Sequence, residues 1–354
     1  MSSQGRKNIC AALVNLIHEY DSILCVQHKL WIRAFEASNQ IDENNLDLAD
    51  ALSKGLIEEC QKTGERALVV EAFKCRARIE SKRGNWQAEI HYLKSALLSG
   101  DPSRHKELFL LGHMLAVAYR EAGCLEEAEQ QFDKGISYAG QIAWRRGIAM
   151  SYNGLGTTCM KRGDFDAAIR AFETAIDSLG EDSKNFALAP IYNNLGLAAQ
   201  RSRDLEGSLA YFSKSLELKI AANDTCGKAM TMTNMVALLE ELGRRTEAVD
   251  FARQASELFQ ELRDYYNSAM AKRTLARQLR RMGQEKEASK VFLEAEDLFR
   301  NRCDCKEMAD NVRAEHTSIT IRTPLWVWLP IFFVFVCFFG LLLLVYAAVS
   351  YLSQ

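Results

Sequence analysis

Four arginines near residue 280 have the clearest capacity for binding chemistry in this sequence. They are Arg273, Arg277, Arg280 and Arg281. A guanidinium group can hold a carboxylate through two parallel hydrogen bonds, so the cluster could bind an acidic peptide. Alternatively, these arginines form an ordinary solvated helix face and pair with the glutamates that follow, Glu285, Glu287 or Glu294. Both interpretations stay open at this point.

Asparagines recur in the middle of the chain and offer a different kind of contact. They are Asn153, Asn193, Asn194 and Asn234. An amide side chain carries both donors and acceptors, so a row of them could hold an extended backbone without requiring a particular side-chain sequence. The alternative is that an asparagine next to a Leu-Gly pair only fits the crossing of two helices.

The sequence lacks the motifs of common catalytic and metal sites. It has no GxxxxGK[ST], HExxH or GxSxG motif, and its six histidines show no ligand spacing. Cys303 and Cys305 could begin a metal site, but no second pair or nearby histidine completes four ligands. We therefore expect a protein that is not an enzyme, with no metal and no cofactor.

Composition excludes further classes of protein. The 44 basic and 46 acidic residues give a net charge of −2, which does not fit a protein that coats a polyanion, and we expect no nucleic-acid partner. Ten cysteines are scattered through 354 residues without a CxxC pair, unlike those of a small secreted disulfide scaffold. Four prolines and twenty glycines are too few for a collagen or a low-complexity linker.

Residue types recur at a fixed interval of about 40 residues, which indicates an internal repeat. Alanine occupies positions 149, 189, 229, 269 and 309. Glycine occupies positions 123, 163, 243 and 283, and Arg203 stands in the one slot without glycine. Phenylalanine occupies positions 132, 172, 212 and 292, with Ala252 as the exception.

One repeat has the pattern of two amphipathic helices. Residues 149–161 and 165–178 both place apolar residues at i, i+3 or i+4, and i+7. Gly163 can take a positive φ between them, and Asp164 can cap the second helix. Gly156 and Ala168 are small where the two helices must approach closely, and Phe172 is expected to fill the gap that they leave against the next repeat. One such pair cannot bury its apolar faces alone, so the pairs are expected to stack.

These residues resemble the tetratricopeptide repeat. The resemblance rests on YNGLG at 152–156 and RGDFDAAIRAFETAI at 162–176, and it extends over about residues 70–300. The period is longer than that of the common form and is similar to that of a longer subclass, found in spindle-orientation adaptors, kinesin light chains and bacterial regulatory repeat proteins. The resemblance implies an all-α fold, a right-handed α-solenoid of helix-turn-helix repeats.

The predicted organisation has four parts. Residues 1–66 form an irregular helical cap, 67–300 form six repeats, 301–323 form a capping helix and linker, and 324–352 form a transmembrane helix. Glu89 stands where Ala168 stands two pairs later, so we expect looser packing in the first pair.

An uncharged C-terminal segment predicts how the protein is localised. Residues 325–352 are dominated by Phe, Leu, Val and Ala, and about 20 such residues suffice to cross a bilayer. Arginines precede the segment and no basic residue follows it, which predicts a tail-anchored, single-pass membrane protein with its bulk in the cytosol. An endoplasmic-reticulum-type or bacterial inner membrane is favoured over a mitochondrial one.

The family resemblance also implies where a partner binds. The first helix of each pair lines a concave groove, and the matching positions here are Lys74, Arg78, Arg120, Asn153, Asn193, Asn194, Arg201, Asn234, Arg273, Arg277, Arg280 and Arg281. Within its own repeat the arginine cluster faces no acidic groove residue. The resulting hypothesis is a membrane-tethered scaffold or adaptor that binds an acidic protein segment, with anionic lipid as a further contact for Arg280 and Arg281. The alternative is a membrane-anchored co-chaperone or assembly factor that handles clients transiently.

Overall fold

The computed structural model describes residues 25–180 and 186–317, and all regular structure within these ranges is helical. The chain divides at residue 222 into two compact units, which we call unit 1 and unit 2. The helices of unit 1 are α2 (Val26–Asp42), α3 (Leu46–Ser53), α4 (Leu56–Thr63), α5 (Arg66–Lys82), α6 (Trp86–Ser99), α7 (His105–Glu121), α8 (Leu125–Gln141), α9 (Arg145–Arg162), α10 (Phe165–Leu179), α11 (Leu188–Arg201) and α12 (Leu205–Ala221). Those of unit 2 are α13 (Thr225–Glu241), α14 (Arg245–Glu261), α15 (Tyr265–Arg281), α16 (Glu285–Asp297), the π-helical turn η1 (Leu298–Arg302) and α17 (Lys306–Thr317).

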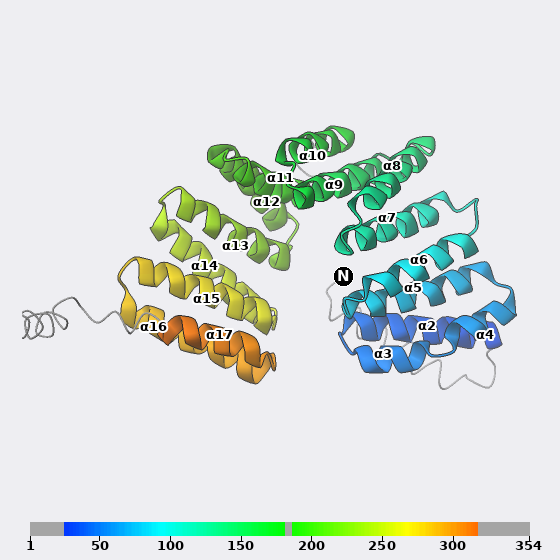
Figure 1. Cartoon of the computed structure of the whole chain (residues 1–354), viewed down its shortest axis with the longest axis horizontal. Coiled ribbons are helices and arrows are strands. Elements are labelled where there is room, and N and C mark those ends of the chain that lie inside the picture. The colour runs from blue at the N-terminus through cyan, green and yellow to red at the C-terminus, as the bar shows by residue number, and fades with distance from the viewer. Residues whose placement is uncertain (1–24, 181–185, 318–354) are drawn as a thin grey trace, which may run out of the picture. The chain divides into compact units, whose positions relative to one another are not determined.

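Consecutive helices form antiparallel pairs that stack on one another within each unit (Figure 1). The second helix of a pair packs on its own first helix and also on the first helix of the next pair, as α8 does with α7 and α9. In unit 2, α14 packs in the same way on α13 and α15. This is the expected all-α repeat architecture. The predicted domain boundaries themselves stay predictions.

Close contacts between phenylalanine rings and glycines fix the distance between neighbouring helices. Phe172 on α10 is fully buried, and a Cβ atom on Gly156 of α9 would lie 2.5 Å from its ring. Phe132 on α8 reaches the next pair, where a Cβ atom on Gly154 would lie 2.2 Å from the ring. The prediction that Gly156 must be small is confirmed, because any side chain there would overlap the ring.

The N-terminal helices follow the packing of a pair although their sequence does not match the repeat. The helices α3 and α4 both pack on α2 and on α5, as a second helix does in later pairs. Gly55, with φ of +70°, separates α3 from α4 and so breaks this second helix in two. The irregular part is therefore one broken helix in an otherwise repeat-like arrangement.

The predicted membrane localisation is contradicted, because no transmembrane helix is found among the described residues. Between residues 25 and 317, outside the gap at 181–185, no helix is both long and apolar enough to cross a bilayer. The longest, α9, has 18 residues and carries arginine or lysine at both ends, whereas a span needs about 20 predominantly apolar residues. The segment on which the prediction depended, 324–352, lies outside the described residues.

Left-handed residues end most first helices, and glycine is missing from one such position. Gly163 follows α9 with φ of +89°, and Arg203 follows α11 with φ of +72°. Asp164 and Asp204 then cap the next helices by accepting hydrogen bonds from Ala167 N and Gly207 N, both at 2.9 Å. A Cβ atom makes the left-handed conformation unfavourable, so Arg203 stores strain that glycine avoids.

Replacing Arg203 with glycine should therefore stabilise the protein. We expect Arg203→Gly to raise the free energy of unfolding by about 0.5–1 kcal/mol, since the left-handed penalty slightly exceeds the entropic cost of glycine. Asn223, with φ of +54°, provides a matched position, and Asn223→Gly should have a smaller effect because asparagine tolerates this conformation. Urea unfolding of the three proteins measures the difference, and a destabilised Arg203→Gly variant would contradict the argument.

The first pair is not packed loosely around Glu89, contrary to expectation. The Glu89 residue on α6 is only 5% exposed, and its Oε2 atom is buried without a hydrogen-bond partner among the described residues. Burial raises the pKa of the Glu89 carboxyl to about 7, although a hydrogen bond with Ser81 opposes the shift. A buried carboxyl group with a raised pKa thus stands where four of the later pairs have alanine.

Stability should depend on pH through Glu89. The pKa is higher in the folded state than in the unfolded state, so the stabilisation is complete below about pH 4.5 and is lost as pH rises through about 7. The Glu89→Gln variant should not show this loss. Between pH 5 and pH 8, its free energy of unfolding should therefore rise by about 1–2 kcal/mol relative to that of wild type. The exposed Glu127 on α8 gives a matched control, Glu127→Gln. Equal pH slopes for wild type and Glu89→Gln in urea unfolding would contradict the prediction.

Candidate functional site

The first helices of successive pairs form a continuous polar face in each unit, which we call the first-helix face. The helices α7, α9 and α11 are neighbours in unit 1, so a residue on one helix meets residues about one repeat period further along the chain. The Nδ2 atom of Asn194 donates a hydrogen bond to Oδ1 of Asn153 at 3.0 Å. The Nη1 atom of Arg120 donates to Oγ1 of Thr157 at 2.6 Å. These predicted groove residues are therefore brought together, but much of their bonding capacity is used within the face.

A lysine–glutamate contact continues the same row. The Nζ atom of Lys161 donates to the carbonyl of Arg120 at 2.7 Å and pairs with Glu121 at 3.1 Å. Burial alone would raise the pKa of Glu121, but hydrogen bonds from Lys161 and Arg120 hold it below its usual value. The charges of this segment are thus balanced locally.

Residues at the N-terminal end of the face pair with α2, which was not recognised as part of it. Arg78 donates to Oγ of Ser38 at 2.6 Å and pairs with Asp42 at 2.5 Å. Lys74 pairs with Glu71 on its own helix at 2.6 Å. Ser38 precedes Arg78 by one repeat period, so the contact between them could have been predicted from the repeat interval.

The other predicted residues lie on or beside the same faces. Asn193 on α11 and Asn234 on α13 are half-buried, and Arg201 is exposed at the C-terminal end of α11. The role of these residues, like that of the whole predicted groove, stays a prediction.

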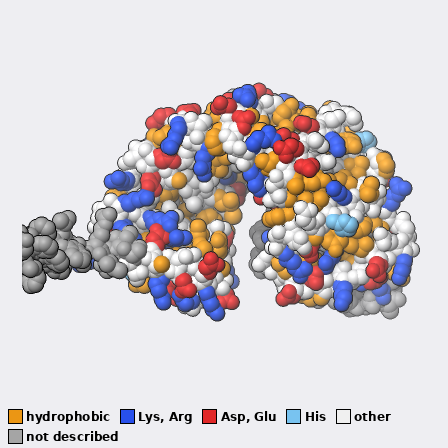
Figure 2. Space-filling model, in the orientation of Figure 1, with side chains coloured by type: hydrophobic (Ala, Val, Ile, Leu, Met, Phe, Trp, Pro, Cys, Tyr) orange, Lys and Arg blue, Asp and Glu red, His pale blue; other side chains and the backbone are white. Residues whose placement is uncertain are grey.

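In unit 2, three arginines of α15 converge on the end of α17. The Nε atom of Arg273 donates to Oε2 of Glu315 at 2.7 Å, and Nη2 of Arg277 donates to the same oxygen at 2.8 Å. Arg280 donates to the backbone carbonyls of Glu315 and His316 at 3.1 and 3.3 Å. We call Arg273, Arg277 and Arg280 the arginine site. Figure 2 shows basic side chains gathered over α15.

The electrostatics of Glu315 reflect this arrangement. Burial alone would raise the pKa of its carboxyl, but hydrogen bonds from Arg277 and Arg273 and their positive charges hold the pKa below the usual value. Hydrogen bonding to Glu315 also raises the pKa of Arg277, so both partners stay charged near neutral pH. The site therefore already binds one carboxylate, which belongs to the chain itself.

The fourth arginine does not belong to the arginine site. Arg281 pairs with Glu240 of α13, and Nε2 of Gln278 donates to the same carboxylate at 2.7 Å.

Arg280 is poorly placed for contact with a lipid surface, because its side chain is 12% exposed and its guanidinium lies 4.4 Å from the centre of the Phe292 ring.

Glu315, the residue at the centre of this site, was not among the residues expected from the sequence. The arginines' own repeat was expected to supply no acidic groove residue, and the acid comes instead from α17 beyond the last pair. Glu315 follows Arg277 by 38 and Arg273 by 42 residues, an interval like those of the other contacts along the face. Glu315 could have been predicted at this site only if α17 had been assigned as the first helix of a further pair.

The structure offers no metal site in its described part. No group of three or more histidine, cysteine or acidic side chains within 25–180 and 186–317 could hold an ion. The Sγ atom of Cys305 donates to the carbonyl of Cys303 at 3.3 Å, and burial raises the pKa of the Cys303 thiol.

Comparison with known proteins relates this geometry to a repeat family. The tetratricopeptide repeat sequence model matches residues 145–221, 187–261 and 227–301. No curated protein sequence matches the chain.

Solved structures of low sequence identity share the fold. A Rap protein in complex with competence and sporulation factor has a TM-score of 0.58 and 14% identity, over 85% of this chain and 90% of that one. The apo quorum sensor NprR from B. thuringiensis has a TM-score of 0.55 and 12% identity, over 90% and 94%. The chain is therefore an all-α solenoid that contains tetratricopeptide repeats.

Proposed function

We propose that the protein is a non-enzymatic scaffold that binds an acidic segment of a partner protein at the arginine site. The observation that carries this proposal is the convergence of Arg273, Arg277 and Arg280 on Glu315. Three guanidinium groups meet Glu315, and the Oε2 atom of Glu285 lies 3.7 Å from Nε of Arg280, so three positive charges face these two carboxylates. The Nε atom of Arg280, moreover, is buried without a hydrogen-bond partner among the described residues.

The position of Glu315 supports this use of the site. It lies on α17, the helix that follows the last pair, and it contacts arginines one first helix earlier on the same face. A partner carboxylate would make the same hydrogen bonds, so Glu315 acts as an internal competitor for it. The Rap protein that shares this fold is complexed with competence and sporulation factor, and this likeness is consistent with partner binding.

Reversing two charges should weaken binding of an acidic probe. The probe is a labelled poly-glutamate peptide, and fluorescence anisotropy with the full-length protein measures its affinity. We expect Arg273→Glu together with Arg277→Glu to weaken binding about ten- to hundredfold, from two lost charge pairs and added repulsion. Binding by the wild-type protein should fall as salt rises, because screening acts over about 8 Å at physiological ionic strength.

Two further variants separate this site from general surface charge. Glu315→Gln removes the internal competitor and should strengthen probe binding. Arg253→Glu is the matched control, because Arg253 is equally a surface arginine but pairs with Glu287 between the second helices α14 and α16. Equal weakening by Arg253→Glu, or no weakening by the double variant, would refute the proposal.

The identity of captured partners distinguishes a scaffold from the alternative function. An affinity capture with the wild-type protein should retain one stoichiometric partner, which the double variant loses. Recovery of chaperones with many different clients would favour the co-chaperone instead. Flotation with anionic vesicles that depends on Arg273 and Arg277, with partner binding intact, would show that the arginines contact lipid.

A further inference from the structure

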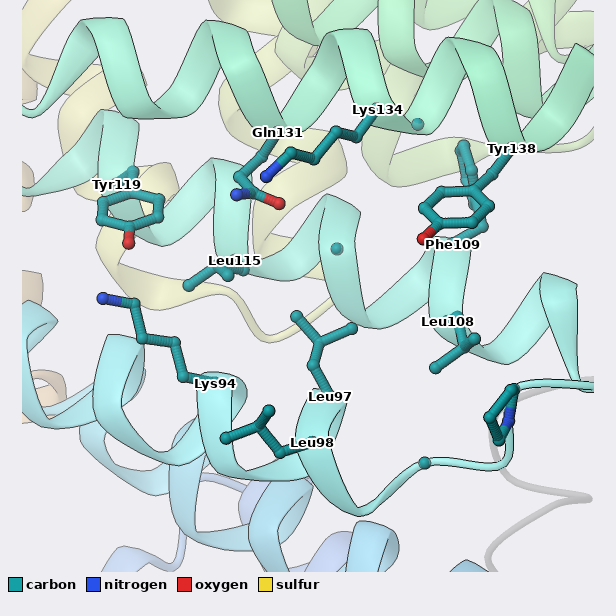
Figure 3. A pocket seen from close by; sticks show the side chains of 14 residues that line it. Lys94, Leu97, Leu98, Leu108, Phe109, Leu115, Tyr119, Gln131, Lys134 and Tyr138 are labelled. Carbon is teal, nitrogen blue, oxygen red and sulfur yellow. The ribbon is translucent and has the colours of Figure 1, made fainter.

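Unit 1 contains an open cavity on the side of the second helices, away from the first-helix face. It lies between α6 and α8, with α7 as its floor, and its volume is about 670 Å³ (Figure 3). Leu97, Leu108 and Leu115 form its apolar walls. Figure 2 shows a group of hydrophobic side chains over α6 and α7.

The cavity exists because one helix position lacks a side chain. Gly112 of α7 lines it, and a Cβ atom there would meet nothing within 4 Å. In the next three first helices, each one repeat period further along, the same position holds Tyr152, Tyr192 and Met232. Gly112 thus leaves empty a place that a large side chain occupies in later pairs.

The pair formed by α11 and α12 shows what fills this place. Tyr192 is 5% exposed and its ring stacks on that of Tyr211, with 6.4 Å between the ring centres and 17° between the planes. The Nζ atom of Lys214 lies 5.1 Å from the centre of the Tyr192 ring. The Tyr192 ring therefore has both an aromatic neighbour and a cation within contact range, which is favourable for an aromatic quadrupole.

The counterparts of these neighbours remain around the cavity although the ring is missing. Two repeat periods before Tyr211 and Lys214 stand Gln131 and Lys134, and both line it. Lys134 thus holds the position from which Lys214 covers Tyr192. The lysine is therefore kept, while Gln131 replaces the stacking ring of Tyr211 and Gly112 replaces Tyr192 itself.

The rim of the cavity carries two lysines and an exposed apolar side chain. Lys94 and Lys134 reach the cavity from opposite helices, and none of the described residues that line it is acidic. Leu98 at its edge is 89% exposed, whereas the equivalent positions in the following pairs are polar, namely Ser137, Asp177, Glu217 and Glu257. An apolar site bordered by two lysines is complementary to an aromatic group that has carboxylates next to it.

We propose that this cavity is a second docking site, which binds a peptide segment of a partner protein through one aromatic side chain flanked by acidic residues. The aromatic ring takes the place that Tyr192 takes in its own pair. The flanking carboxylates face Lys94 and Lys134. This site is independent of the arginine site, because the lining residues come only from α6, α7, α8 and the loop between α6 and α7.

The test uses a short labelled peptide with one central phenylalanine between aspartates, titrated into the full-length protein by fluorescence anisotropy. We expect binding that weakens about ten- to hundredfold when alanine replaces the phenylalanine, as the loss of one buried aromatic side chain predicts. Gly112→Tyr should fill the cavity from within and weaken binding at least tenfold. The same change should raise the thermal midpoint, because it removes a helical glycine and fills a void.

Matched variants make each outcome decisive. Lys134→Glu should weaken binding about tenfold, while Lys214→Glu, at the position already occupied by Tyr192, should leave it unchanged. Gly112→Met, which copies Met232, provides a second cavity-filling variant if Gly112→Tyr folds poorly. The difference in affinity between the phenylalanine and alanine peptides should be the same in Arg273→Glu with Arg277→Glu as in wild type, because the aspartates of both peptides contact the arginine site equally.

Four results would overturn the proposal. They are no binding of the phenylalanine peptide by wild type at millimolar concentration, equal binding of the alanine peptide, undiminished binding by the cavity-filling variants, and equal weakening by Lys214→Glu. Binding of free 3-phenylpropionate as tightly as the peptide would indicate a small-molecule pocket and would also overturn it.

Discussion

The packing of a phenylalanine ring against glycine is the constraint on which the rest of this structure depends. Phe172 against Gly156, and Phe132 against Gly154, set how closely neighbouring helices approach within a pair and between pairs. A single helix pair leaves one apolar face unburied, and in unit 1 such contacts recur from pair to pair, since the ring of Phe212 likewise meets Gly196. Their recurrence fixes the period of the repeat. That period, in turn, brings residues about one repeat apart into contact on the first-helix face.

The polar face is a consequence of this spacing, and most of its charges are balanced from within. Arg120 and Lys161 share Glu121, Arg281 meets Glu240, and the amides of Asn153 and Asn194 bond to each other. A row of charged and amide side chains is therefore not, by itself, a binding surface. The arginine site differs because its three cations outnumber the carboxylates of Glu315 and Glu285 beside them, and that excess of donors is what a partner could use.

At three positions the residue departs from the repeat pattern and changes the local structure. Arg203 takes a left-handed conformation that later turns assign to glycine, and Glu89 buries a carboxyl group where later pairs bury alanine. Gly112 opens a cavity where later pairs place a large side chain. Each of the three residues interrupts the regular pattern at a single position. The consequence is backbone strain at Arg203, desolvation of a carboxyl group at Glu89 and unfilled space at Gly112.

The sequence alone determined the repeat, the two helices of each pair and the small residues at their crossing, because these depend on local periodicity and on side-chain size. It did not determine which charges are satisfied. Glu315 and Ser38 lie outside the recognised repeats, and their contacts with Arg277 and Arg78 arise only when α17 and α2 stack as further first helices. The empty place beside Gly112 could likewise not be predicted, because a glycine inside a helix indicates only that the helix is less stable. Only the packing of α6, α7 and α8 decides whether the space above it is filled or open.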